Sequence, residues 1–171
     1  MHMPGSEYLV ALAAIAMAFV AFSVIVLVLR QITGGALTPF HTLLVRYTVE
    51  CGLIAAAFAL LPPLLALTEL SDTANFRISS AVLAVTFLAY FLNYVRRRRT
   101  VMPGPLPPRF LILAAISVPM YAALAFNAGA VYLKVAIWPY AFFVTWILVQ
   151  AGVVFLLTID VFLQQPPGDG R

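Results

Sequence analysis

The chain has 171 residues, of which 64% are hydrophobic and 9% are charged, and its formal net charge is +4. Soluble domains carry about 45–50% apolar and about 25% charged residues, so this composition excludes an ordinary water-soluble domain. The lone cysteine, Cys51, excludes an internal disulfide, and two histidines distant in sequence provide no ligand spacing for a metal, so we expect neither a metal nor a cofactor.

The first apolar segment runs from Tyr8 to Leu29 without a charged residue. It is longer than the roughly 7–15 residues of a signal-peptide core, and no Lys or Arg precedes it. We therefore expect an uncleaved transmembrane helix, because about 20 apolar residues cross a bilayer. Ala14 and Ala18 are spaced for close contact with another helix, although alanine is also common in membrane helices.

The second helix is predicted to begin at Pro39 with Thr38 as its N-cap, because these residue types favour those two positions. Pro62 and Pro63 lack backbone donors and are expected to kink or end the helix. A short polar loop over residues 68–76 then leads to a third uncharged span.

Prolines mark the next boundary, since residues 100–109 contain four of them and are expected to form an extended cytoplasmic linker. Two further apolar segments follow, with Pro119 expected to bend the fourth helix and residues 164–171 expected to form a disordered tail. The predicted fold is all-α: a polytopic integral membrane protein with a single domain, built as a bundle of five transmembrane helices. The spans are expected at about residues 8–29, 41–64, 77–95, 110–130 and 136–161.

The distribution of Lys and Arg predicts the orientation of this bundle. One set of loops holds six arginines, whereas the other holds Arg77 and Lys134 beside the acidic Glu69 and Asp72. The arginine side is therefore expected to be cytoplasmic, with the N-terminus outside and the C-terminus inside, in a plasma membrane of the bacterial inner-membrane type. These arginines are expected to set the topology and to contact anionic lipid, not nucleic acid, because four of them directly follow a span. They are Arg30, Arg96, Arg97, Arg98, Arg99 and Arg109.

The only opposite charges inside the apolar spans are Arg46 and Glu50, four residues apart on one face of the second helix. Glu50 is expected roughly 10 Å inside the hydrocarbon, where a bare carboxylate costs about 2–3 kcal/mol. The pair could be a proton or ion site, or it could join helices. The structural role is favoured because no second intramembrane carboxylate or lysine continues a relay.

The opposite face of this helix is small, which predicts close helix contact there and a central position in the bundle. The small face consists of Thr48, Gly52, Ala55, Ala56 and Ala59.

Polar residues of the third span are expected to face the charged pair. Ser79, Thr86 and Asn93 recur every seven residues, with Tyr90 beside them. Because the third span runs antiparallel to the second, Asn93 is expected near Arg46, and Tyr90 near Glu50.

The fifth span adds two polar residues. Gln150 near the bilayer centre could join the charged pair or line a contact with another protein. Asp160 could pair with Arg46 or Arg30, or it could be a solvated interfacial carboxylate. The complete polar cluster is predicted to contain Arg46, Glu50, Thr86, Tyr90, Asn93, Gln150 and Asp160.

Three classes of function fit this pattern. The favoured class is an interaction protein: an accessory subunit, assembly factor or sensor that binds another membrane protein or its own copies. It is favoured because the loops are short and the polar groups are too few for a transport pathway. A small oligomeric transporter or channel using Glu50 is the alternative. An enzyme acting on lipid is the third, but His41 has no partner at a catalytic spacing and no catalytic constellation is visible.

Overall fold

The computed structural model describes residues 5–32, 38–68, 70–101, 108–129 and 137–164, without the side chains of residues 108–110 and 160–164. The described residues form five long helices, one short 3-10 helix and no strand: α1 (Ser6–Ile32), α2 (Pro39–Leu65), η1 (Ala66–Thr68), α3 (Asp72–Val101), α4 (Pro108–Gly129) and α5 (Ile137–Gln164). Each long helix is apolar enough to cross a membrane. The predicted five-helix, all-α architecture is confirmed for this part of the chain, whereas insertion and orientation stay predictions.

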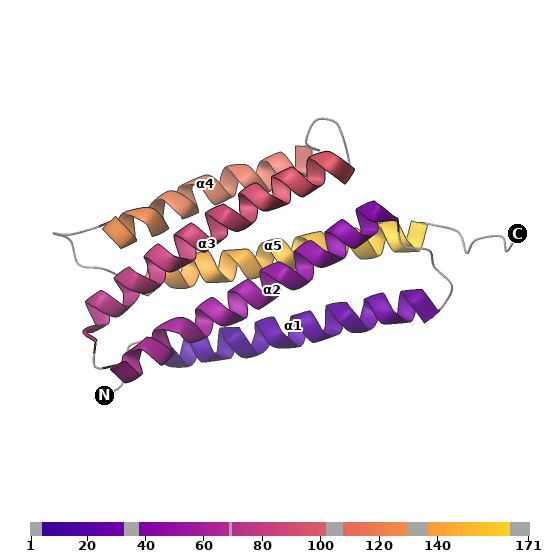
Figure 1. The fold of residues 1–171 in the computed structure, drawn as a ribbon. Coiled ribbons are helices and arrows are strands. Elements are labelled where there is room, and N and C mark those ends of the chain that lie inside the picture. The colour runs from indigo at the N-terminus through magenta and orange to yellow at the C-terminus, as the bar shows by residue number, and fades with distance from the viewer. Residues whose placement is uncertain (1–4, 33–37, 69, 102–107, 130–136, 165–171) are drawn as a thin grey trace, which may run out of the picture.

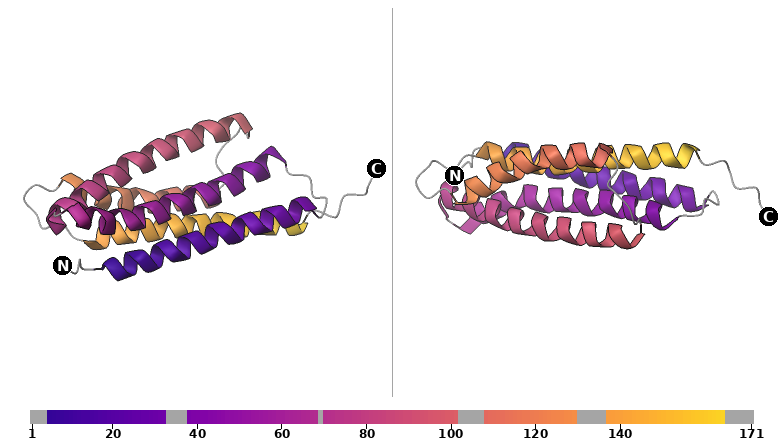
Figure 2. Two further views of the ribbon diagram at one scale, coloured as in Figure 1. Left: turned by 60° about the horizontal axis from the view of Figure 1, so that its bottom comes forward. Right: turned by 90° about the horizontal axis from the view of Figure 1, so that it is seen from above.

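The helices form an elongated bundle in which α1 begins at one end and α5 finishes at the other (Figure 1). α2 is central, since it packs extensively against α1 and α5 and also against α3. α4 lies at an edge of the bundle, in contact with α3 and α5 (Figure 2). It is also the least buried of the five helices.

The two ends of the bundle differ in charge. Arg30 and residues 96–99 lie where α1 and α3 terminate, which we call the arginine end. Glu7 lies on the first turn of α1, and Asp72 and Arg77 lie on the first two turns of α3, at the opposite end. This separation follows from the alternating direction of the helices.

The small face of α2 explains its central position. All five of its residues are buried, as expected, and a Cβ atom added at Gly52 would collide with the side chain of Val20 on α1. On α1, Val20 and the backbone of Ala16 lie opposite Gly52, and both residues are buried. The Ala14–Ala18 pair is exposed and makes no helix contact of this kind within the described chain.

The start of α2 follows the prediction, with Thr38 as the N-cap and Pro39 in the first helical turn. The Thr38 hydroxyl accepts a hydrogen bond from the His41 backbone amide at 3.3 Å, and Nδ1 of His41 accepts one from the Thr38 amide at 3.4 Å. This reciprocal arrangement satisfies donors that a helix start otherwise leaves unpaired. His41 is therefore a buried capping residue.

α2 continues through both prolines and ends at Leu65. Proline at position 62 removes the amide that would bond to the Phe58 carbonyl, and the Tyr140 hydroxyl of α5 donates to that carbonyl instead. The amide of Asn75, on α3, donates to the Pro62 carbonyl at 2.8 Å. The helix therefore tolerates proline at position 62 because α5 supplies the missing donor, while the Asn75 contact joins α3 to a carbonyl that also accepts from the Ala66 amide.

A Tyr140→Phe variant is expected to lower the free energy of unfolding by roughly 1 kcal/mol, because the Phe58 carbonyl is left without a donor. In a Pro62→Ala background the amide of residue 62 can bond to the Phe58 carbonyl, so Tyr140→Phe should lower the free energy of unfolding by clearly less. Denaturant titration in mixed micelles measures both costs. Equal costs in the two backgrounds would show that the tyrosine does not replace the missing amide.

α3 is longer than expected at both ends. It begins at Asp72, so most of the predicted polar loop is helical, because Asn75 and Phe76 are buried against neighbouring helices. It also continues through the four arginines to Val101, since arginine is a good helix former. The predicted linker 100–109 is thus helical at both ends, and its centre, like residues 165–171 of the predicted tail, lies outside the described residues.

Candidate functional site

Three charged residues from two helices meet near the arginine end. The Nε atom of Arg46 donates to Glu50 at 2.6 Å within α2, as predicted from their spacing. Nη1 of Arg97 on α3 lies 3.2 Å from both carboxylate oxygens of Glu50. We call Arg46, Glu50 and Arg97 the arginine clamp.

Aromatic packing between α2 and α3 positions the clamp. The Tyr47 ring lies between two rings of α3, with centroids 6.1 Å from Tyr90 and 4.8 Å from Tyr94. Arg97 follows Tyr90 by seven residues and so returns to the same helix face. Ring contacts one and two turns away therefore bring the guanidinium of Arg97 to Glu50.

The clamp is partly exposed on the bundle surface. The side chains of Arg46, Glu50 and Arg97 are 56%, 27% and 33% exposed. Two arginines and one glutamate leave one net positive charge. A guanidinium lies on each side of the Glu50 carboxylate, so this charge costs less free energy in an apolar span than an unpaired carboxylate would.

A groove of about 560 Å³ lies beside the clamp, between the end of α1 and the start of α2. Arg46 and Glu50 form part of its wall, and most of the lining is apolar. The lining residues are Val24, Leu27, Gln31, Thr42, Val45, Arg46, Val49 and Glu50. A site that processes lipid with these residues would need His41 and the charged pair in one cavity. His41 does not line this groove, so the groove does not provide that combination.

The polar stripe of the third span is buried only at its start, where it makes a hydrogen bond within α3. Ser79 is buried and donates to Asn75 at 3.3 Å, whereas Thr86 is half-buried and Asn93 is exposed. Tyr90 is half-buried beside Tyr47, with its hydroxyl near the Cys51 thiol. The expected contact of Asn93 with Arg46 is thus replaced by that of Arg97 with Glu50, one turn further along α3.

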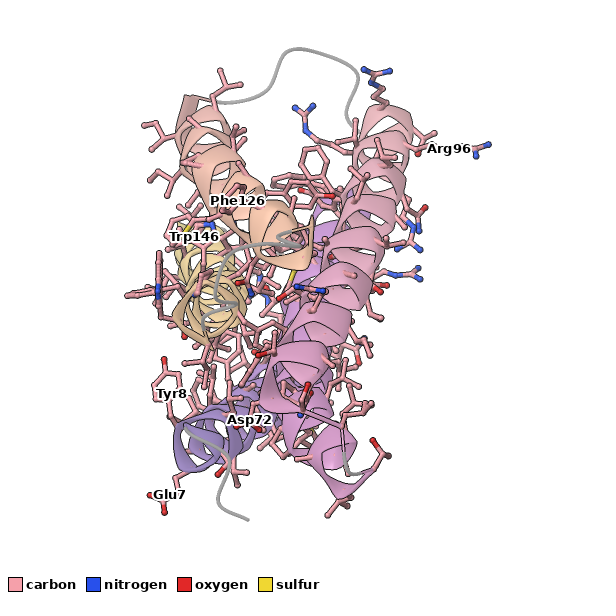
Figure 3. All side chains as sticks on the ribbon, turned by 90° about the vertical axis from the view of Figure 1, so that its left-hand side faces the viewer. Glu7, Tyr8, Asp72, Arg96, Phe126 and Trp146 are labelled. Atoms are coloured by element: carbon pink, nitrogen blue, oxygen red, sulfur yellow. The ribbon has the colours of Figure 1, made fainter. Side chains whose placement is uncertain are left out.

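Gln150 belongs to a different cluster. Its amide donates to the Ser117 hydroxyl on α4, which also accepts a 3.0 Å hydrogen bond from Nε1 of Trp146. Figure 3 shows Trp146 on α5 near α4. Gln150 therefore joins α5 to α4, while the side chain of Asp160 lies outside the described part.

The predicted topology arginines have different surroundings. Arg96 projects outward from α3 (Figure 3) and Arg99 is exposed, whereas Arg98 is buried near Tyr94. Arg30 is half-buried at the end of α1. The side chain of Arg109 is outside the described part of the chain.

Sequence reasoning missed the role of Arg97 because the arginine run was read as the end of a span. The signal was its seven-residue spacing from Tyr90, which becomes informative only if the helix is continued past the apolar residues. Asn75 was missed for the same reason, since it was placed in a loop.

Cys51, the single thiol, is buried close to the hydroxyls of Tyr47 and Tyr90. Among the described residues, no three His, Cys, Asp or Glu side chains lie together in a way that could hold a metal ion. Comparisons with protein-family models, curated proteins and solved structures found no match to this chain. The arrangement offers a charge clamp and an adjoining groove.

Proposed function

We propose that the protein is a multi-pass membrane protein that acts by helix–helix interaction, as an accessory subunit, assembly factor or sensor, in a plasma membrane of the bacterial type. The arginine end faces the cytoplasm, the N-terminus is outside and the C-terminus is inside. The partner is another membrane protein or a second copy of the chain.

The use of the polar side chains carries this proposal. The polar side chains inside the described bundle are used mainly to hold one helix against another. The main contacts are Arg97 to Glu50, Asn75 to Pro62, Asn127 to Ser80, Tyr140 to Phe58 and Gln150 to Ser117. Such contacts specify which helices meet. They do not form a series of ionisable groups along the bundle, as a proton or ion pathway requires.

A transporter or channel based on Glu50 is the second candidate, favoured by the groove that this carboxylate lines. Against it, the carboxylate already has two arginine partners. A proton or cation that binds to Glu50 would have to compete with both guanidinium groups.

Photo-crosslinking in native membranes tests the interaction proposal. A crosslinking residue is placed, in separate variants, at Ile15 of α1, Leu92 of α3 and Ile112 of α4, all exposed. A partner helix covers one face of the bundle, so we expect a defined intermolecular product from one of these positions and little from the others. The product is analysed by mass spectrometry.

Buried Leu83 serves as the internal control, because a crosslinker there reaches only helices of the same chain. No intermolecular product from any exposed position, together with recovery of the protein as a lone monomer in mild detergent, would contradict the proposal.

A further inference from the structure

We propose that the groove between α1 and α2 binds one anionic phospholipid of the cytoplasmic leaflet, with the phosphate on Arg46 and an acyl chain along the apolar wall. This inference rests on the proposed membrane insertion. It assigns a lipid contact to Arg46, in addition to the arginines at the helix ends for which sequence predicted one.

The shape of the groove suits an amphipathic ligand. Gln31 and Thr42 lie nearest the arginine end, on the last turn of α1 and the first turn of α2. Val24 and Val49 line the groove further into the bundle, and the helix rise from residue 42 to residue 50 is roughly 12 Å. The volume of about 560 Å³ lies within the range of small-molecule sites, roughly 300–1,000 Å³. The groove thus has a polar mouth at Gln31 and Thr42 and apolar side chains from both helices further in, with Arg46 and Glu50 along its α2 side.

The guanidinium of Arg46 is available to a phosphate. It uses Nε for Glu50, and its two terminal amino groups have no other hydrogen bond to the described residues. The side chain is also 56% exposed. A planar guanidinium can hold two phosphate oxygens at once, which favours arginine over lysine at such a site.

The charge of the clamp selects the headgroup. Glu50 is shared with Arg97, so the clamp keeps one net positive charge, and Arg30 lies at the same end of the bundle. A negatively charged lipid complements this field, whereas the ammonium group of a zwitterionic lipid opposes it. The apolar wall requires an acyl chain, so free phosphate is a poor match.

Native mass spectrometry of delipidated full-length protein tests the assignment. The protein is titrated with phosphatidylglycerol or with phosphatidylcholine of the same acyl chains. We expect one phosphatidylglycerol per chain, bound about tenfold more tightly than phosphatidylcholine. Arg46→Gln should weaken phosphatidylglycerol about tenfold, whereas Arg96→Gln, which removes an equal charge from the exposed run at the same end, should change it less than about twofold.

A second pair of variants keeps the clamp intact. Val49→Trp places a large side chain in the groove, while Leu53→Trp places the same side chain one turn further along α2, at an exposed position outside it. Only Val49→Trp should abolish the single tight lipid, and circular dichroism should show unchanged helix content in both. Equal affinity for both headgroups, equal loss in the two arginine variants, or retained binding in Val49→Trp would each overturn the proposal.

Flotation with vesicles separates this inference from the proposed function. A protein that stays in the aqueous phase contradicts membrane insertion and, with it, the lipid site. A protein that floats, but binds phosphatidylglycerol equally well in the wild type and in both groove variants, contradicts the lipid site alone.

Discussion

A Gly52→Leu variant is expected to lose about 3 kcal/mol of unfolding free energy, the largest effect of any single change considered for this bundle. A Cβ atom at this position already collides with Val20, and the backbone of Ala16 lies behind it. The larger side chain must push α1 away from α2, and these two helices share the most extensive contact among the described helices. Denaturant titration in mixed micelles measures the loss.

Alanine at two glycines provides a test of sign. Gly152, on α5, has no atom within 4 Å of an added Cβ, so Gly152→Ala should stabilise by roughly 0.5–1 kcal/mol through helix propensity. Gly52→Ala should destabilise instead, because the valine opposite is β-branched and has one strongly preferred rotamer in a helix. Adding Val20→Ala to Gly52→Ala should recover part of that cost. If the effects of the two substitutions on stability are simply additive, a direct contact between positions 20 and 52 is contradicted.

Glu50→Gln is expected to destabilise the bundle by about 2 kcal/mol, because it leaves two guanidinium groups facing each other without a carboxylate. The partial exposure of all three clamp side chains keeps the effect below that of a fully buried pair. Adding Arg97→Gln removes the repulsion, so the double variant should be no less stable than Glu50→Gln alone. The measurement is again the free energy of unfolding in micelles.

Arg96→Gln is the matched control for Arg97, since it is one position earlier, exposed and outside the clamp. It should change stability by less than about 0.5 kcal/mol. Equal effects of Arg96→Gln and Arg97→Gln on stability would mean that the clamp contributes nothing specific.

Reconstituted vesicles provide a further comparison: higher ion flux in the wild type than in Glu50→Gln would favour the transporter candidate over the interaction protein.

Local chemistry in the sequence determined the number of helices, the capped start of α2 and the small face that makes α2 central. Composition over about 20 residues identifies a span, Thr38 and Pro39 mark a helix start, and the residues of the small face share one side of a helix by spacing alone. Each of these features depends on neighbours within a few turns. They can therefore be derived without knowing what lies across the bundle.

Only the tertiary structure decided which polar groups meet. It placed Arg97 on Glu50 while leaving Asn93 exposed, it joined Gln150 to Ser117, and it supplied Tyr140 to a carbonyl freed by proline. These partners depend on the length, rotation and relative height of separate helices, and a shift of one residue turns a side chain by about 100°. The apolar pattern of a span constrains the rotation of its helix only weakly, because lipid and the interior of the bundle are both apolar.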